Sequence, residues 1–288
     1  MEALPVYLVH WRQPEWCAAA VTSLLASDLP VRVTVVNNSP ELASGLRAAL
    51  PGEVRVIETG GNLGYTGGAN VGIADWLDGN AALAAVGSHD LHVEPNTFRL
   101  LSEALEHHPE FGLLGPHLVG KVAGANSLGS GSGDGVRPVE WLSGTLLVLR
   151  RECIEQIGGF DEWLGSYVED LDLCLRAGMA GWKVGLVPEA RAWGLGTGDV
   201  GAGWRGRSNL VLVRRRHVGR RAALATWCST LAEGVRGFVS SVIPGRPPGV
   251  RALSRRRARA FLGSLTSWRY VLGRVPPPQC DPRARPRP

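Results

Sequence analysis

The sequence predicts an α/β fold, a mostly parallel sheet wound with helices on both faces, followed by a C-terminal helical extension. Three observations support this. Short apolar runs of strand length alternate with helical patterns over the first 60 residues, which is the order of a wound parallel sheet. Further along, a long apolar run leads into an acidic cluster that opens a helix. Finally, the composition changes near residue 214, where arginine begins to dominate.

The first half of the chain supplies the strands and helices of the predicted sheet. The expected elements are strands at 6–9, 31–36, 54–57 and 81–86 and helices at 15–26 and 41–50. In wound sheets, ligands bind beyond the carboxyl ends of the strands. Asn37 follows the second strand and is therefore a candidate binding residue. A simple Asx turn that ends the strand fits the same residues.

A glycine-rich stretch at residues 60–72 follows the third strand. Glycines allow close backbone approach, so this stretch could fold around a diphosphate or a ribose before the next helix. It is not a dinucleotide-binding fingerprint, because the spacing does not give a strand–GxGxxG–helix unit. A generic glycine-rich loop is the alternative.

Residues 141–189 carry the strongest chemical signal. The apolar run 142–149 is followed by a Gly-Gly turn at 158–159, an aromatic-rich loop, and the acidic cluster 169–172 that opens a helix at 171–177. Carboxylates are electrostatically favoured at a helix start, so Glu169 or Asp170 could be a helix cap only. Three carboxylates within four residues exceed what capping requires, so a helix cap and a catalytic carboxylate fit this spacing equally well.

The sequence of this region resembles that of the catalytic domain of family 2 glycosyltransferases, especially the bacterial rhamnosyltransferase-like branch. The matching segments are WLSGTLLVLRRE, IGGFDE and YVEDLDLCLRAGMAGWKVGLVPEA, and the resemblance extends over roughly residues 5–215. It implies a GT-A fold and an inverting transfer from a nucleotide-sugar donor to an acceptor hydroxyl. It also implies that Asp170 is the general base, with Glu169 beside it.

The resemblance implies two further groups of site residues. The donor-binding group is His10, Asn37, Asn62, Gly64, Gly68, Asn70, Ser88 and Asp90. The acceptor-binding group is Trp141, Gly144, Asp161 and Trp163. Asn37 stands where the family has an aspartate that helps to hold the nucleobase, so we expect a changed base preference.

The metal site that the resemblance implies is weakened in this chain. Asp90 is the one carboxylate of the segment Ser88-His89-Asp90, and Gly194 stands where the family usually carries a histidine. A hydroxyl is a weak neutral ligand for Mg²⁺ or Mn²⁺. The sequence therefore predicts either metal-independent chemistry or a changed ligand set. Three arginines could neutralise diphosphate charge instead of a cation. They are Arg191, Arg205 and Arg207.

Charge divides the chain into an acidic body and a basic tail. Residues 214–288 hold 17 Arg, no Lys and two acids, whereas the first 213 residues hold 14 basic and 24 acidic residues. We expect a catalytic domain at 1–215, a basic amphipathic helical extension at 216–275 and a disordered tail at 276–288. The extension could bind an anionic membrane surface or dock on the acidic body. No nucleic-acid reader motif is present, so nucleic acid is not an expected partner.

The overall composition is that of a folded, globular protein. Hydrophobic content of 44% and charged content of 20% are those of a globular protein. The amino-terminal residues do not read as a signal peptide, and we expect a cytoplasmic protein that is peripheral at the inner membrane face.

The acceptor is either a lipid-linked glycan or a soluble natural product. The alternative of another class is a non-catalytic nucleotide-sugar-binding scaffold, which the weakened metal site favours and the acidic pair disfavours.

Overall fold

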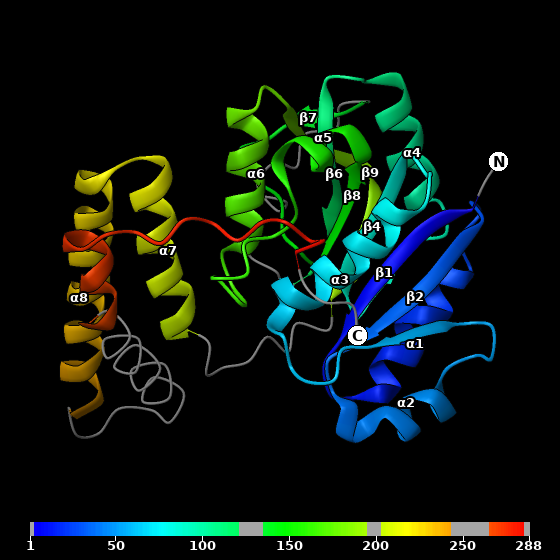
Figure 1. Ribbon diagram of the computed structural model, residues 1–288, viewed down its shortest axis with the longest axis horizontal. Coiled ribbons are helices and arrows are strands. Elements are labelled where there is room, and N and C mark those ends of the chain that lie inside the picture. Colours follow the sequence, from blue (N-terminus) through cyan, green and yellow to red (C-terminus); the bar gives the residue numbers. More distant parts are fainter. Residues whose placement is uncertain (1–2, 121–134, 195–202, 243–264, 285–288) are drawn as a thin grey trace. The chain divides into compact units, whose positions relative to one another are not determined.

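The structure is a computed structural model that describes residues 3–120, 135–194, 203–242 and 265–284. The described residues form two compact units. The first lies within Met1–Gly165, Glu169–Gly196 and Gln279–Pro288, and the second lies within Ser166–Val168 and Thr197–Pro278. The loop that glycine- and serine-rich composition predicts at 127–135 falls almost wholly outside the described residues. Figure 1 shows the elements of both units.

The first unit is built on one sheet, which has nine strands in the part of the chain that the structure describes. They are β1 (Leu4–His10), β2 (Val31–Asn37), β3 (Arg55–Glu58), β4 (Leu83–Ser88), β5 (Leu91–Val93), β6 (Phe111–Leu118), β7 (Arg137–Pro138), β8 (Leu146–Arg150) and β9 (Lys183–Gly194). Their order is β3-β2-β1-β4-β8-β6-β9-β5, with β7 on β9. Strands β1–β4, β6 and β9 run one way and β5, β7 and β8 the other. The predicted mostly parallel sheet is confirmed.

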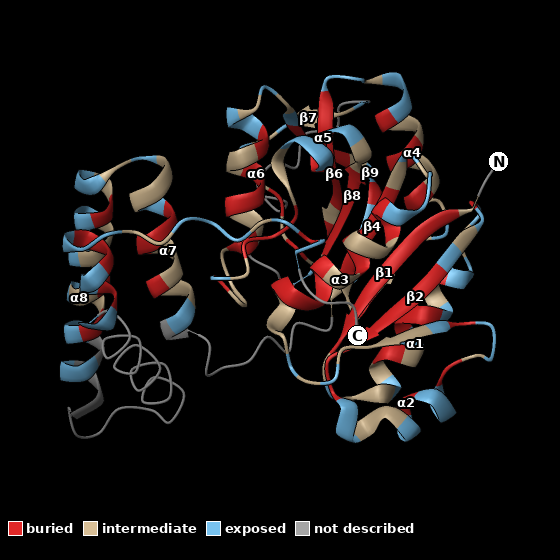
Figure 2. Cartoon of the chain, viewed as in Figure 1, coloured by how far each residue is buried: buried red, intermediate tan, exposed pale blue. Residues whose placement is uncertain are grey.

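Helices cover both faces of this sheet, as the sequence predicts. The helices of the first unit are α1 (Pro14–Leu25), α2 (Ala43–Ala49), α3 (Gly64–Asp78), α4 (Thr97–His107), α5 (Arg151–Ile157) and α6 (Glu169–Met179), with a 3-10 turn η1 (Pro40–Leu42) before α2. Apolar residues of α1, α2 and α4 join one buried cluster with the sheet. Those of α3, α5 and α6 join a second cluster on the opposite face. Figure 2 shows the burial concentrated on the strands and on the helix faces that meet them.

Glycine in α3 lets that helix lie close to the sheet. A Cβ added at Gly72 would lie 2.8 Å from Cγ of Tyr7 on β1, and one at Gly68 would lie 2.7 Å from Cγ1 of Val9. Both distances are too short for real side chains, so larger residues would push α3 away from β1. The helix begins at Gly64, inside the stretch that the sequence predicts as a loop. Helix–sheet packing therefore explains part of the glycine-rich pattern.

The second unit is helical. It contains α7 (Gly203–His217), α8 (Arg220–Val242) and a helix at 265–272. Trp227 of α8 packs on Trp268, with the ring centroids 4.5 Å apart, and Ala223 and Thr230 are buried on the same side of α8. The basic amphipathic extension expected at 216–275 includes α8 and the helix at 265–272, while its residues 243–264 lie outside the described residues. No described helix has both the length and the apolarity to cross a bilayer.

The domain boundaries of the structure differ from the expected ones at two places. Helix α7 begins at Gly203 and belongs to the second unit, although the sequence places residues up to 215 in the catalytic domain. The chain then returns to the first unit at Gln279. Gln279 and Cys280 make backbone hydrogen bonds to the loop after α5, where the sequence predicts a disordered tail. Backbone pairing of this kind leaves no signal in composition, on which that expectation rests.

Candidate active site

Four polar residues stand in a row at the carboxyl ends of adjacent parallel strands. The strand register pairs His10 of β1 with Asn37 of β2 and Asn37 with Glu58 of β3. On the other side of β1, Val9 pairs with Ser88 of β4. We call Glu58, Asn37, His10 and Ser88 the strand-end row. It occupies the edge at which wound sheets bind their ligands.

Asn37 connects three of these strands. Its Nδ2 donates to Oε2 of Glu58 at 2.8 Å, and its Oδ1 accepts from the backbone N–H of Ser39 at 2.9 Å. Oδ1 also lies 2.8 Å from Nδ1 of His10. An aspartate here would set its carboxylate against Glu58 and could not donate to it. The amide is thus matched to Glu58, which gives a physical reason for the departure from the family aspartate.

His10 and His89 form a buried imidazole pair beside the row. Because Asn37 Oδ1 can only accept, His10 Nδ1 is the donor of their bond, and His10 Nε2 carries a lone pair. Nδ1 of His89 lies 3.3 Å from the carbonyl of Val9 and donates to it. The two rings are 5.4 Å apart, edge to face, and Nε2 of each is buried without a hydrogen-bond partner among the described residues. Burial lowers the pKa of both histidines.

Acid should destabilise the protein through this pair. The folded-state pKa of each histidine lies below that of the unfolded chain, so the unfolded chain binds more protons below about pH 6.5. The resulting stability is complete above that pH and is lost as the pH falls through the folded-state pKa. We expect the free energy of unfolding to fall by up to about 1.4 kcal/mol per histidine per pH unit. Urea denaturation at about pH 7.5 and about pH 5.5 measures this, and an equal fall in His89→Gln would contradict it.

The expected metal position holds one carboxylate. Ser88 Oγ donates to Asp90 Oδ1 at 2.6 Å, so the hydroxyl already occupies a lone pair of that carboxylate. Gly194 pairs with Leu91, next to Asp90, and offers no side-chain ligand. Among the described residues, no three His, Cys, Asp or Glu side chains are grouped as metal ligands. This donor set does not fit a divalent cation held by the protein alone.

Asp170 lies at the start of α6 and is held from two sides. Its Oδ2 accepts from the N–H of Gly144 at 2.9 Å, and its Oδ1 accepts from the N–H of Leu171 at 2.8 Å. The side chain is only partly buried. Burial nevertheless raises the pKa of Asp170 above its usual range, while the two N–H donors act the other way. The carboxylate is therefore fixed in direction and more basic than an exposed aspartate.

Tyr65 connects the predicted base to the donor side. Its hydroxyl donates to the carbonyl of Gly144 at 2.6 Å. Burial raises the pKa of Tyr65 well above its usual value, and the negative charges of Glu169, Asp170 and Asp90 raise it further. All three carboxylates thus act on one phenol. The structure brings the predicted catalytic pair and the predicted diphosphate-side aspartate together around α3.

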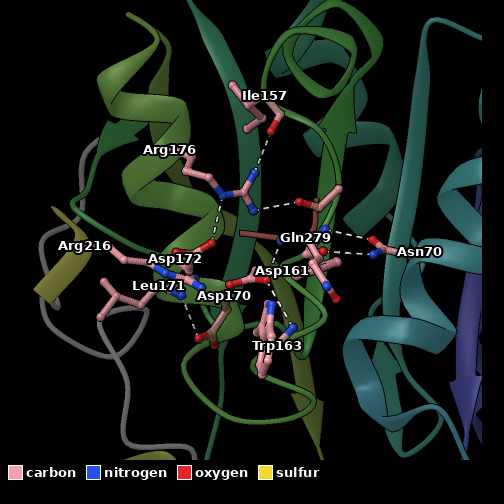
Figure 3. A network of polar contacts seen from close by, with 12 residues as sticks. Asn70, Ile157, Asp161, Trp163, Asp170, Leu171, Asp172, Arg176, Arg216 and Gln279 are labelled. Atoms are coloured by element: carbon pink, nitrogen blue, oxygen red, sulfur yellow. Dashed lines mark hydrogen bonds and ion pairs between the residues drawn. The ribbon is translucent and has the colours of Figure 1, made fainter. Parts of the chain in front are cut away.

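Residues 158–165 follow α5 and lead towards α6. We call them the acceptor loop, because they contain the predicted acceptor residues Asp161 and Trp163. Asn70 on α3 donates from Nδ2 to the carbonyl of Phe160 at 2.9 Å and accepts from the Phe160 N–H at 2.8 Å. Arg176 on α6 donates to the carbonyl of Gly159 at 2.7 Å and pairs with the buried Asp172 at 2.8 Å. Figure 3 shows these contacts meeting at the loop.

Two predicted ligand residues have positioning roles in this network. Asn70 is fully buried, and its amide clamps the acceptor loop to α3. Asp161 is also fully buried, and its Oδ1 accepts from the N–H groups of Trp163 at 3.1 Å and Gln279 at 2.9 Å. We assign both side chains to loop positioning. The donor contact predicted for Asn70 and the acceptor contact predicted for Asp161 stay predictions.

The remaining predicted positions are distributed around the same site. Asn62 Oδ1 accepts from the N–H of Gly64 at 2.9 Å and so supports the start of α3. The Gly64 carbonyl accepts from Asn38 at 2.8 Å, and Gly68 packs on the same Asn38 side chain. Trp163 is 48% exposed and is free to stack on a ligand. Trp141 packs against the buried cluster on the α3 side of the sheet.

The contributors to the site that the sequence prediction lacks include Glu58, Tyr65 and Arg176. Glu58 ends β3 as Asn37 ends β2, so comparing strand ends could have identified it. Tyr65 and Arg176 act through residues 79 and 17–19 positions away. No local pattern identifies such partners.

The family match and the fold together define the class of this protein. Its mostly parallel sheet with helices on both faces matches the GT-A architecture of solved glycosyltransferases. Residues 89–276 match the family described as "Glycosyl transferase family group 2". The chain belongs to this family and is a glycosyltransferase.

Curated relatives agree with this assignment. The chain is 31% identical over 234 residues to the N-acetylglucosaminyl-diphospho-decaprenol L-rhamnosyltransferase of Mycobacterium tuberculosis strain H37Rv, covering 66% of this chain and 75% of the relative. It is 37% identical over 54 residues to the rhamnosyltransferase WbbL of Escherichia coli K12, covering 19% and 20% of the two chains. The relatives place the chain in the rhamnosyltransferase-like part of the family.

Solved structures share the fold. The mannosyltransferase PcManGT from Pyrobaculum calidifontis, in complex with GDP-Man and Mn²⁺, aligns with a TM-score of 0.57 at 13% identity over 92% of this chain and 86% of its own. S. aureus TarS 1–349, in complex with UDP-GlcNAc, aligns with a TM-score of 0.56 at 13% identity over 92% and 90%. At these identities the likeness supports the fold alone.

Proposed function

We propose that the chain moves a sugar from a nucleotide-sugar donor to an acceptor hydroxyl with inversion, and that Asp170 is the general base. The observation that carries this proposal is the state of the Asp170 carboxylate. It is oriented by the N–H of Gly144, it is partly accessible, and burial raises its pKa. A base with these properties can take a proton from an alcohol as the alcohol attacks.

The proposed reaction is a single displacement. The acceptor oxygen forms a bond to the anomeric carbon while its proton passes to Asp170. The bond between the anomeric carbon and the diphosphate oxygen breaks, and the nucleoside diphosphate leaves with the electron pair. Attack opposite to the leaving group inverts the anomeric configuration. Asp170 then releases the proton to solvent. Glu169 lies beside the base, 8% exposed, and we assign it to positioning the acceptor side.

The strand-end row and the start of α3 would hold the donor. His10 and His89 offer buried Nε2 lone pairs, which can accept hydrogen bonds from the N–H or hydroxyl groups of a nucleoside. Solved neighbours in complex with GDP-Man or UDP-GlcNAc support a nucleotide sugar as the ligand class. The Mn²⁺ of one neighbour makes a divalent cation plausible. Asp90 is the protein carboxylate that would face a cation shared with the diphosphate.

A lipid-linked glycan is the proposed acceptor. The M. tuberculosis relative is named for a diphospho-decaprenol acceptor, which is a membrane-resident substrate. In the second unit, exposed apolar residues of α8 such as Leu224 (41%) and Phe238 (59%) accompany the exposed arginines Arg221 and Arg236. Apolar side chains beside arginines favour an anionic bilayer surface. We therefore propose peripheral binding at the membrane face where such acceptors are presented.

Vesicle binding tests the membrane part of the proposal. The protein should float with phosphatidylcholine vesicles that contain phosphatidylglycerol, and much less with phosphatidylcholine alone. About 0.5 M salt should weaken the binding, because it screens the arginines. Phe238→Ser should reduce flotation several-fold, whereas Val119→Ser, an exposed apolar residue of the first unit, is the matched control. Equal binding to both vesicle types would contradict an electrostatic contribution.

A donor and transfer assay tests the function itself. Nucleotide sugars that bind the native state must raise the melting temperature, so a panel of donors identifies the nucleotide. The selected donor is then incubated with diphospho-polyprenol-linked acceptors, with and without chelator, and the glycosylated product is measured. Product formation supports the proposal. Donor binding without transfer to lipid-linked or soluble acceptors would favour the non-catalytic scaffold, to which Ser88 and Gly194 also point.

A further inference from the structure

The end of the chain lies against the acceptor loop within the first unit. The N–H of Gly159 donates to the carbonyl of Cys280 at 2.7 Å, and the N–H of Glu162 donates to the carbonyl of Gln279 at 3.1 Å. In the other direction, the N–H of Gln279 donates to Asp161 Oδ1 at 2.9 Å. We call residues 279–283 the C-terminal strap. Figure 3 shows Gln279 beside Asp161, Trp163 and Asn70.

The strap makes a second contact with the first unit, and a glycine in the acceptor loop leaves space for the strap backbone. Arg283 donates to the carbonyl of Leu77 near the end of α3 at 2.9 Å. On the loop, Gly158 has φ +78°, and a Cβ added there would clash with the Cys280 carbonyl oxygen. Any other residue would therefore collide with the strap backbone. The strap contacts the loop through backbone groups, and Gly158 is needed for this contact. The position of the strap on the loop is therefore fixed.

We propose that the C-terminal strap is a positioning element of the catalytic site, which sets the acceptor loop for transfer. This inference rests on the proposed function. Asn70 on α3 and Arg176 on α6 hold the loop from two other directions, and α6 carries the base Asp170 at its start. Without the strap, the N–H groups of Gly159 and Glu162 lose their acceptors and Asp161 loses one donor. The loop, which carries Trp163, is then free to shift relative to Asp170.

The strap should affect the chemical step more than donor binding. The donor is expected at the strand-end row. Among the described residues, no side chain of this row is hydrogen-bonded to the strap. A misplacement of about 1 Å of a positioned group can cost on the order of a hundredfold in rate. We therefore expect removal of the strap to lower kcat by about tenfold or more and to raise the acceptor KM. The donor dissociation constant should change by less than about twofold.

Two truncations of the full chain test this expectation. One ends after Pro278 and lacks the strap, and the matched control ends after Ala284 and keeps it. The first should lose kcat as stated, the second should behave as wild type, and a peptide of residues 279–284 added in trans should restore part of the lost rate where a scrambled peptide does not. Unchanged kcat in a folded strap-free chain would overturn the proposal. So would a loss confined to donor affinity.

A point variant keeps the proposal falsifiable if the truncation does not fold. Gly158→Ala should displace the strap and lower kcat. Gly181→Ala is the matched control, because Gly181 also has positive φ (+94°) but has no atom within 4 Å of an added Cβ. Equal effects of both variants would show backbone strain alone and overturn the proposal.

Amide hydrogen exchange gives a readout that does not need activity. The N–H groups of Gly159 and Glu162 should be protected in the wild type and exchange faster in Gly158→Ala than in Gly181→Ala. If these exchange rates are observed but the wild type has no transferase activity, the proposed function is contradicted and the contact between strap and loop is still supported. Unchanged exchange in an active enzyme would overturn the strap alone.

Discussion

Asp170→Asn should lower kcat by about a thousandfold, within the range that general base catalysis contributes. Asparagine is nearly the same size and keeps one oxygen for the N–H of Gly144 or Leu171, so the fold should survive the change. It cannot take a proton, so the acceptor hydroxyl would attack without assistance. The donor dissociation constant should stay within about twofold of the wild-type value. It is measured from the rise in melting temperature as the donor concentration increases. Steady-state transfer kinetics give kcat.

The pH dependence of the wild type provides a second check on the same residue. Because burial raises the pKa of Asp170, the base is lost to protonation at a higher pH than for an exposed aspartate. The acid limb of the kcat profile should therefore lie above the ordinary value of 3.8. Glu155→Gln, which changes an exposed carboxylate on α5 (48% exposed side chain), is the control and should keep wild-type kcat. Wild-type kcat in Asp170→Asn would remove Asp170 from the mechanism.

Arg176→Met should destabilise the first unit by about 3 kcal/mol or more. The change removes the guanidinium from Asp172, whose side chain is 1% exposed, and takes away the donors to the carbonyls of Ile157 and Gly159. Breaking a buried ion pair on one side typically costs about 3–5 kcal/mol, because a buried charge loses its partner. Urea denaturation followed by intrinsic fluorescence measures the free energy of unfolding.

A surface pair gives the matched control for this prediction. Arg55 bonds to Asp75 through two contacts of 2.7 and 2.8 Å, but the Arg55 side chain is 58% exposed. Arg55→Met should therefore cost less than about 1 kcal/mol. If the two variants lost equal stability, the Arg176 network would not be the structural support of the acceptor loop that we describe.

Local patterns predicted the elements of the sheet well. The alternation of apolar runs and helical segments placed β1, β2, β3 and α1 within two residues of their observed bounds. The acidic cluster at 169–172 placed the start of α6. These features depend on periodicity and on end signals that lie within a few residues of each other. The same signals made Asp170 recognisable, because its position at a helix start is local information.

Side-chain roles that depend on distant partners could not be predicted in this way. Asn70 matches a family motif, yet its amide is used by Phe160, 90 residues away. Asp161 looks like an acceptor ligand in sequence, yet it holds Gln279, 118 residues away. The tail after residue 276 has the composition of a disordered segment, yet its backbone pairs with the acceptor loop. Composition reports on side chains, whereas this contact is made mainly by backbone groups.

The anomeric configuration of the product tests the central claim most directly. A single carboxylate base and a direct attack on the donor require one inversion, so NMR of the purified product should show the new linkage with the configuration opposite to that of the donor sugar. Retention of the donor configuration would require two successive displacements or a different mechanism. It would contradict the assignment of Asp170 as the base of a single-displacement glycosyltransferase.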